Sequence, residues 1–181
     1  NSRNWSIWFA DENTGFIGSG SQNAFTTRIL KTTNAGVNWS VVYVDASGST
    51  SYLTSLGGYG NTICASWQNG SCVRSSDAGA TWTVIPSSFP SGSLVNEIEF
   101  LNSTTGFAAG SAGTFSRTTD GGLTWTSLGT TQVDWSYFQV KVVSATEIYV
   151  VGDPTYLYRS SDMGNTWTPL AVNVTGPAVT F

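Results

Sequence analysis

Short segments in which apolar and polar residues alternate run along the whole chain, separated by turns rich in glycine, serine, threonine and asparagine. Alternation with a period of two is typical of β-strands, and no helix is expected. The segments recur in groups of four, which predicts four blocks of four strands each. The expected strands are 6–9, 15–18, 29–31 and 39–42; 52–55, 63–66, 72–74 and 82–85; 97–100, 106–109, 115–117 and 125–128; and 139–142, 148–151, 157–159 and 167–170.

An eight-residue motif follows the third strand of every block. Its copies occupy 32–39, 75–82, 118–125 and 160–167, and each ends in a tryptophan, so the tryptophans recur every 42 to 43 residues. A fixed period of this length indicates one supersecondary unit stacked on copies of itself. Four antiparallel strands per repeat of this length are typical of a β-propeller blade.

The motif Ser/Thr-x-Asp-x-Gly-x-Thr-Trp resembles the Asp-box, or BNR repeat, of sialidases, sortilin-type receptors and related propellers. The longer pattern of residues 100–110 and 117–122 is similar to the photosystem II assembly-factor family of propellers. Both resemblances imply an all-β propeller of four-stranded antiparallel blades. We expect residues 1–181 to form one propeller or part of one, with blades at about 5–44, 50–87, 94–130 and 137–172. Residues 173–181 are expected to be the start of a fifth blade or a closing strand.

The repeated Asp-box residues are interpreted as structural. An Asp or Asn oxygen can accept hydrogen bonds from backbone amides two residues ahead, glycine permits a positive φ, and the indole covers the turn. Asn34 keeps the accepting oxygen without the charge, which favours this role over catalysis or calcium binding. The residues concerned are Asn34, Gly36, Trp39, Asp77, Gly79, Trp82, Asp120, Gly122, Trp125, Asp162, Gly164 and Trp167.

A cation precedes every Asp-box: Lys31, Arg74, Arg117 and Arg159. Resemblance to sialidases, which use an arginine triad, would make these residues a basic ring for an anionic ligand. We favour the alternative, in which each stem packs between blades and the charge meets solvent or a carboxylate, because the position is repeated in every block.

Composition narrows the possible functions. Charged residues make up 10% of the chain and the net charge is −4, which argues against a nucleic-acid partner. No apolar run approaches the roughly 20 residues needed to span a bilayer. The chain has no histidine, which excludes catalysis by imidazole. Glu97 and Glu99 alternate on one strand and point to one face, but solvation of both is favoured over a catalytic pair. No metal and no cofactor are predicted.

Cys64 and Cys72 are the only cysteines, and their spacing fits neither a zinc knuckle nor a redox Cys-x-x-Cys pair. We place them opposite each other across a hairpin and predict a local disulfide. Asn69 and Asn102 lie in sequons on expected loops and are the predicted N-glycosylation sites.

Three aromatic residues outside the repeat positions are candidates for ligand binding: Trp67, Trp135 and Tyr137. Loop aromatics flanked by amide and carboxylate side chains suit sugar stacking or a protein contact. Packing of each ring against the next blade is the alternative.

The four predicted blades do not determine how the propeller closes into a ring. The chain begins at Asn1, so it is either a mature form or a piece of a longer protein. In order of preference, four blades indicate a fragment of a larger propeller, a compact four-bladed ring, or an array completed by self-association through its open edges.

We expect a non-enzymatic, extracellular or cell-surface module that binds or assembles protein or glycan. One alternative is part of a sialidase-like or xyloglucanase-like glycoside hydrolase. The second, implied by the family resemblance, is an assembly factor for a membrane protein complex.

Overall fold

The computed structural model describes residues 3–20, 27–45, 52–85, 88–89, 94–128, 137–152 and 156–171, and these residues form sixteen strands and no helix. Blade one contains β1 (Arg3–Phe9), β2 (Gly15–Gly20), β3 (Arg28–Thr32) and β4 (Ser40–Val44). Blade two contains β5 (Leu53–Tyr59), β6 (Thr62–Trp67), β7 (Cys72–Ser75) and β8 (Thr83–Ile85). Blade three contains β9 (Val95–Phe100), β10 (Gly106–Gly110), β11 (Phe115–Thr118) and β12 (Thr126–Ser127). Blade four contains β13 (Tyr137–Ser144), β14 (Glu147–Gly152), β15 (Tyr156–Ser160) and β16 (Thr168–Leu170).

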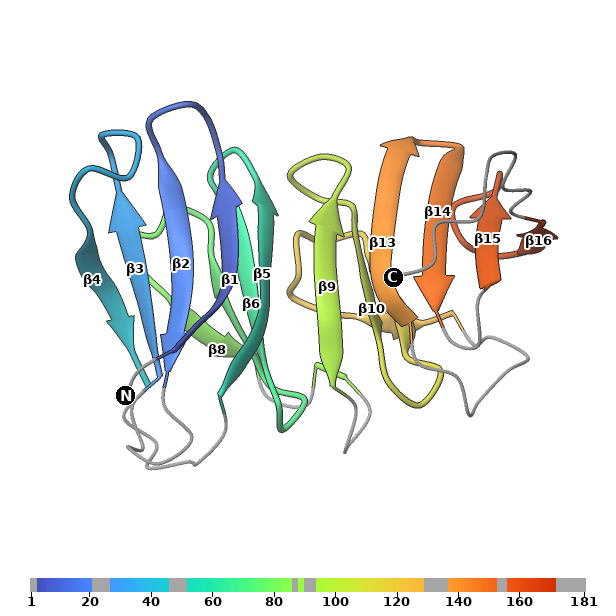
Figure 1. Ribbon diagram of the computed structural model, residues 1–181, viewed down its shortest axis with the longest axis horizontal. Helices are drawn as coiled ribbons and strands as arrows, with labels where there is room; N and C mark the ends of the chain where they lie inside the picture. Colours follow the sequence, from blue (N-terminus) through green and yellow to red (C-terminus); the bar gives the residue numbers. More distant parts are fainter. Residues whose placement is uncertain are drawn as a thin grey trace, which may run out of the picture.

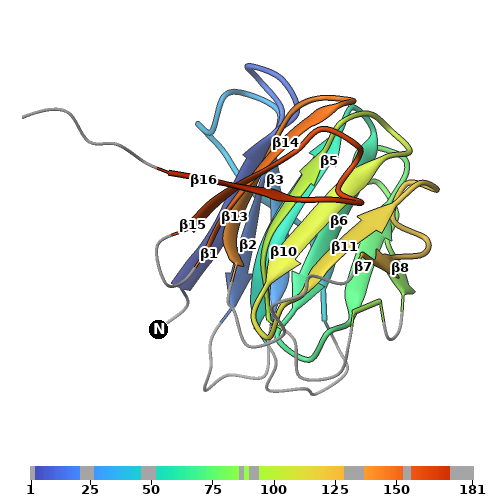
Figure 2. The ribbon, with the colours of Figure 1, turned by 90° about the vertical axis from the view of Figure 1, so that its right-hand side faces the viewer.

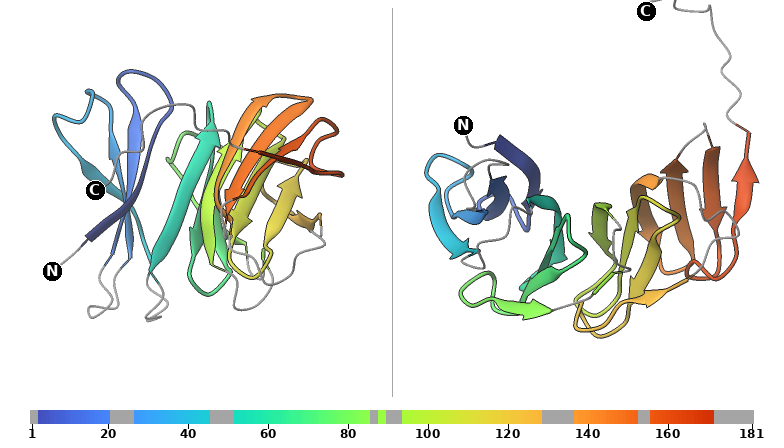
Figure 3. Two further views of the ribbon diagram at one scale, coloured as in Figure 1. Left: turned by 45° about the vertical axis from the view of Figure 1, so that its right-hand side comes forward. Right: turned by 90° about the horizontal axis from the view of Figure 1, so that it is seen from below.

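Every blade is an antiparallel meander whose strands pair in chain order (Figure 1). The first strands β1, β5, β9 and β13 contact one another in sequence and form the inner side of the array. The sheets follow an arc, with blade one at one end and blade four at the other (Figure 3). Seen from the blade-four end, β15 and β16 lie in front of the other sheets (Figure 2). The predicted four-stranded antiparallel blades are therefore present, and they form a β-propeller array.

The hydrophobic core lies between blades. Three clusters of buried side chains each combine residues of two successive blades. Phe16 and Leu56 meet between blades one and two, and Cys64 and Ile98 meet between blades two and three. Apolar side chains thus fill every interface between successive sheets, and blades two and three bury both of their faces, as expected of stacked repeats.

The first strand of blade two extends further than the sequence indicated. We predicted a strand over 52–55, whereas β5 runs from Leu53 to Tyr59 and includes Gly57 and Gly58. Both glycines lie beyond the predicted strand, and a Cβ at Gly57 would lie 2.0 Å from the carbonyl oxygen of Ile98. Glycine is therefore required here because β5 and β9 approach each other closely.

The predicted disulfide is absent, since Cys64 and Cys72 are both free and buried. Cys64 pairs with Arg74 across the hairpin and Cys72 pairs with Ser66, so the two cysteines are diagonal neighbours and not directly opposite. Diagonal positions lie about 7–8 Å apart at Cα, beyond the usual disulfide range. A hydrogen bond with Cys72, together with burial, raises the pKa of the Cys64 thiol well above its ordinary value.

The repeated cations join successive blades. Lys31 Nζ donates to the carbonyl oxygen of Ala78 at 2.7 Å, Arg74 Nε to that of Gly121 at 2.6 Å, and Arg117 Nη1 to that of Met163 at 3.0 Å. In each case the acceptor belongs to the Asp-box turn of the following blade. Packing between blades is confirmed for these three side chains, whose partner is a backbone carbonyl. The fourth cation, Arg159, instead pairs with the carboxylate of Glu147 in its own blade, as the alternative with a carboxylate partner predicted.

Candidate functional site

Each Asp-box carboxylate accepts hydrogen bonds from groups of its own turn. In blade two, the Oδ1 atom of Asp77 accepts hydrogen bonds from Ser75 Oγ and the Thr81 amide, both at 2.8 Å. Its Oδ2 atom accepts from Thr81 Oγ1 at 2.6 Å, while the Gly79 amide donates to Ser75 Oγ. The bonded amide therefore lies four residues ahead of the Asp, and not two as predicted. Ala78 and Gly79 both have positive φ, which lets the turn close around the carboxylate.

The same hydrogen bonds recur in blades three and four, and Asn34 reproduces the bond to the amide four residues ahead in blade one. The indoles of Trp39, Trp82 and Trp167 donate to the carbonyl of the Asp-box glycine, whereas Trp125 Nε1 is buried without a partner among the described residues. Hydrogen bonds from Thr81 and Thr166 lower the pKa of Asp77 and Asp162, respectively, to about 2. These acids therefore stay ionised within separate turns, one to a blade.

The aromatic residues predicted to bind ligand do not form an exposed site. Trp67 is 3% exposed, and its ring lies edge-on to Tyr43 of blade one at 5.9 Å. Tyr137 is 4% exposed, and its ring packs against Phe115 at 6.4 Å. Both were placed in loops, but Trp67 is the last residue of β6 and Tyr137 the first of β13, so their rings enter the core between blades. Trp135 lies outside the described residues.

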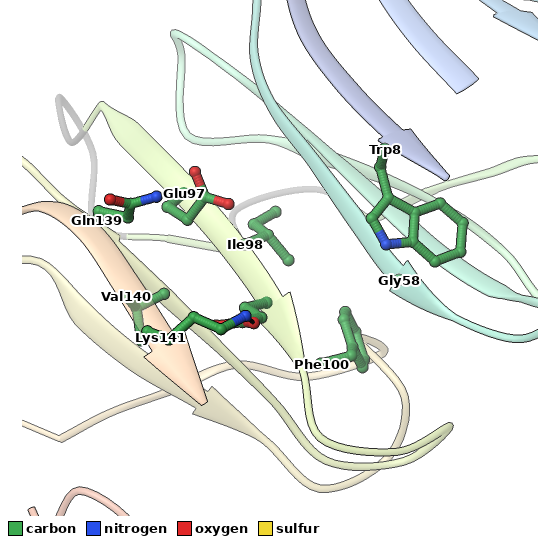
Figure 4. A pocket seen from close by; sticks show the side chains of 9 residues that line it. Trp8, Gly58, Glu97, Ile98, Phe100, Gln139, Val140 and Lys141 are labelled. Carbon is green, nitrogen blue, oxygen red and sulfur yellow. Dashed lines mark hydrogen bonds and ion pairs between the residues drawn. The ribbon is translucent and has the colours of Figure 1, made fainter. Parts of the chain in front are cut away.

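A cleft of about 270 Å³ opens on the inner strands instead. Trp8 of β1 and Gly58 of β5 stand on one side of it, and residues of β9 and β13 stand on the other (Figure 4). The β9 and β13 lining consists of Glu97, Ile98, Glu99, Phe100, Gln139, Val140 and Lys141. The cleft therefore draws on all four blades and combines apolar walls with a few polar groups, as ligand sites commonly do.

Two carboxylates in the cleft differ in their surroundings. Glu99 forms an ion pair with Lys141 and also accepts a hydrogen bond from the Val142 amide. No hydrogen bond from another described residue reaches the Glu97 carboxylate. Burial, reinforced by the charge of Glu99 and opposed by that of Lys141, raises the pKa of Glu97 to about 7. Glu97 is thus the acid of this cleft that accepts no hydrogen bond from a described residue, and Lys141 offsets its charge only in part.

The family follows from residues 87–179, which match the model of the Photosynthesis system II assembly factor YCF48 family over about half of the chain. The chain belongs to this family. No curated protein matches it.

Solved structures share the fold with this member of the YCF48 family. A structure described as YCF48 bound to D1 peptide is 14% identical with a TM-score of 0.61, over 93% of this chain and 82% of that one. YCF48 from Cyanidioschyzon merolae is 17% identical with a TM-score of 0.66, over 96% of this chain and 57% of that one. The GH74 enzyme of Niastella koreensis is 19% identical with a TM-score of 0.73, over 92% of this chain and 30% of that one. The chain therefore spans little more than half of the algal protein and less than a third of the glycosidase.

Of the residues that line the cleft, only Glu97 and Glu99 were singled out from the sequence. Those that were missed include Trp8, Gln139 and Lys141. Each lies on a first strand, and the stacking of first strands at the inner side of a propeller is the signal that could have brought them together. Glu97 and Glu99 were noticed for their alternation, but the sequence carried no sign that Glu97 is half-buried. Within the described ranges, no group of three or more acidic or cysteine side chains is placed to hold a metal ion, and no helix could span a membrane.

Proposed function

We propose that this chain is a non-enzymatic binding module that holds a segment of a partner protein in the inner cleft, with a basic side chain of that segment against Glu97. Membership of the YCF48 family supports a role in protein assembly, and a solved YCF48 binds a D1 peptide. The observation that carries the proposal is a half-buried carboxylate that accepts no hydrogen bond from a described residue, inside a cleft lined by both apolar and polar side chains.

The chemistry of the cleft suits a cationic group. A positive charge near Glu97 would offset the burial that disfavours its ionised form. Trp8 on the facing wall offers an aromatic surface over which an ammonium or guanidinium group binds favourably. The backbone and apolar side chains of an extended segment could then cover Ile98 and Val140 along the inner strands.

The alternative of a glycoside hydrolase has less support from the described residues. The Asp-box acids are separated and hydrogen-bonded within their turns, and Glu99 is committed to Lys141 and to the Val142 amide. A panel of fluorogenic glycosides tests this directly, because turnover that is lost in Glu97→Gln would replace the binding module with an enzyme.

Binding of the D1 peptide recognised by the solved relative, measured by fluorescence anisotropy with the whole chain, tests the proposal. Because the pKa of Glu97 is about 7, the carboxylate ionises as the pH rises, and affinity should increase between pH 6 and pH 8. Glu97→Gln should weaken binding at pH 8 by roughly tenfold or more and remove the pH dependence. Glu12→Gln, an exposed acid outside the cleft, serves as the matched control.

Two otherwise identical synthetic peptides, one with a lysine and one with glutamine in its place, provide the complementary arm, and the glutamine peptide should bind weakly at both pH values. Affinity that is the same for wild type and Glu97→Gln at pH 8 would overturn the proposed site.

An extracellular location and glycosylation at Asn69 and Asn102 remain predictions. In the structure both asparagines accept hydrogen bonds through Oδ1 within their own turns, and digestion of the natural protein with a peptide N-glycosidase tests for attached sugar.

A further inference from the structure

The two acids of the inner cleft lie at neighbouring levels of the same strand. Glu97 and Glu99 both pair with β10, two positions apart, so their side chains leave the same face of β9. Residues two apart in a strand are separated by about 6.5 Å along it. An extended ligand that follows β9 presents its own side chains at the same spacing. Its residues i and i+2 can therefore meet the two carboxylates in turn.

Strand β13 provides a different side chain at each of these levels. Relative to the second strand of its blade, Gln139 occupies the position that Glu97 has in blade three. Lys141 corresponds to Glu99 in the same way. Both side chains of β13 line the cleft (Figure 4). The strand therefore offers a neutral amide at the level of Glu97 and a cation at the level of Glu99.

Both oxygens of Glu99 already have donors from β13. Its Oε1 atom pairs with Lys141 Nζ, and its Oε2 atom accepts a hydrogen bond from the Val142 amide at 2.5 Å. A ligand cation that displaced Lys141 from Glu99 would exchange one ion pair for another. Such an exchange contributes little net free energy of binding, because the same type of interaction is present before and after it.

Glu97 has no comparable partners. No hydrogen bond from a described residue reaches its carboxylate, and Lys141 offsets its charge only in part. Ser6, which has the same position in blade one, accepts a hydrogen bond from the Leu56 amide of blade two at 3.0 Å. A side chain at this position is thus placed to accept a donor, and in blade three the described part of the chain provides none. One of the two carboxylates is therefore left for a ligand.

We propose that Lys141 determines how many basic side chains the cleft accepts, a specificity role that rests on the proposed function. Lys141 is the chain's own occupant of Glu99, so the ligand supplies a single cation and places it at Glu97. The partner segment accordingly carries one basic residue and an uncharged residue two positions away. Without the Lys141 cation both carboxylates would be open, and a segment with basic residues at i and i+2 would be preferred.

Fluorescence anisotropy of the full chain with synthetic peptides that differ only at positions i and i+2 tests this role. One peptide carries lysine at i and glutamine at i+2, one carries lysine at both, and one carries glutamine at both. Binding is measured at pH 8, where Glu97 is largely ionised, and at about 0.15 M salt, which screens charges outside the cleft. Wild type should bind the single-lysine and double-lysine peptides within about threefold of each other.

Lys141→Met keeps the length of the side chain and removes its charge. This variant should prefer the double-lysine peptide by at least about tenfold, because the second lysine now pairs with Glu99. Adding Glu99→Gln to Lys141→Met should abolish the preference. Arg28→Gln, which removes a cation at an exposed position outside the cleft, should behave like wild type. The ratio of the two affinities is compared within each protein, so a change in folded fraction or in Glu97 ionisation that affects both peptides cancels.

The outcomes separate this inference from the function on which it rests. If Glu97→Gln abolishes binding of the single-lysine peptide but the affinity ratio is equal in wild type and Lys141→Met, the role of Lys141 is overturned and the proposed function stands. A wild type that itself prefers the double-lysine peptide by about tenfold overturns the same role. Absence of binding to either lysine peptide, or binding that Glu97→Gln does not change, overturns both.

Discussion

At the scale of single residues, one oxygen atom organises each Asp-box. Oδ1 of the Asp or Asn accepts from a hydroxyl two residues before it and from an amide four residues after it. Asn34 makes both bonds without a charge, so the geometry of the acceptor matters more than ionisation. The second carboxylate oxygen adds a bond from the threonine hydroxyl, which exists in the three copies that carry Asp.

Asp77→Asn tests this division between geometry and charge. We expect the melting temperature at neutral pH to fall only slightly, because Asn keeps the Oδ1 acceptor, whereas Asp77→Ala should lower it by several degrees through loss of all three side-chain bonds. Thermal unfolding followed by circular dichroism provides the measurement. An equal loss in both variants would contradict the role of Oδ1, and Glu12→Ala provides an exposed acidic control.

Acid pH extends the same prediction. The pKa of Asp77 is lowered from 3.8 to about 2 by its hydrogen bonds with Thr81, so the folded state holds the ionised form more strongly than the unfolded state does. Its stabilisation is therefore fully present above about pH 4 and is lost as the pH falls toward 2. Asn does not titrate, so the difference in denaturant midpoint between wild type and Asp77→Asn should shrink over this interval. A difference that is constant with pH would exclude the ionised carboxylate as its source.

At the scale of the elements, the cation on the third strand of blades one to three connects its sheet to the next one. The donor reaches across to a carbonyl that the positive φ of the Asp-box turn exposes, so the turn and the joint depend on each other. Lysine serves in the first joint and arginine in the next two. A single directed hydrogen bond is therefore sufficient, and a planar guanidinium is not required.

Arg74→Ala should destabilise the chain by about 1.5–3 kcal/mol, the usual value of a hydrogen bond to a charged group, because the Gly121 carbonyl loses its donor. Arg74→Lys should recover most of that loss, since lysine performs the same task at position 31. Urea unfolding curves of the two variants supply the values, with Arg28→Ala as an exposed arginine control. If lysine were no better than alanine, the joint would depend on guanidinium geometry.

The sequence predicted the elements better than the contacts between them. The spacing of the tryptophans located all four sheets, because each repeat carries its own copy of the Asp-box motif at the same place in the sequence. It misplaced the first strand of blade two, where Gly57 reflects the approach of β9 and not a turn. It left Trp67 and Tyr137 open between ligand binding and packing against a neighbouring blade, and the structure shows packing. The sequence could not decide because both residues were expected in loops, whereas they are strand residues. The cleft around Glu97 could not be predicted from the sequence, because its walls come from strands of four separate repeats whose packing the sequence does not specify.

At the scale of the whole molecule, each blade is stabilised mainly by its contacts with the blades next to it along the chain. Each hydrophobic cluster joins two successive blades, and the joints made by the repeated cations follow the same order. The extensive contacts between strands of different blades, as far as the described residues show them, all join successive blades. In such an array, the free energy of local opening in a blade depends on the strength of its own interfaces and not only on the total stability of the chain.

Two single core substitutions, one near each end of the arc, should therefore lower amide protection in different blades. Leu56→Ala, between blades one and two, should cost about 2–5 kcal/mol and lower amide protection mainly in those blades. Val140→Ala, between blades three and four, should lower protection mainly there, because it removes contacts with Phe107 and Phe115. Hydrogen exchange read by mass spectrometry, at a concentration where the chain is monomeric, distinguishes the two maps. Uniform loss of protection in both variants would mean that the four blades unfold as a single cooperative unit, and it would contradict a stability that depends on each interface separately.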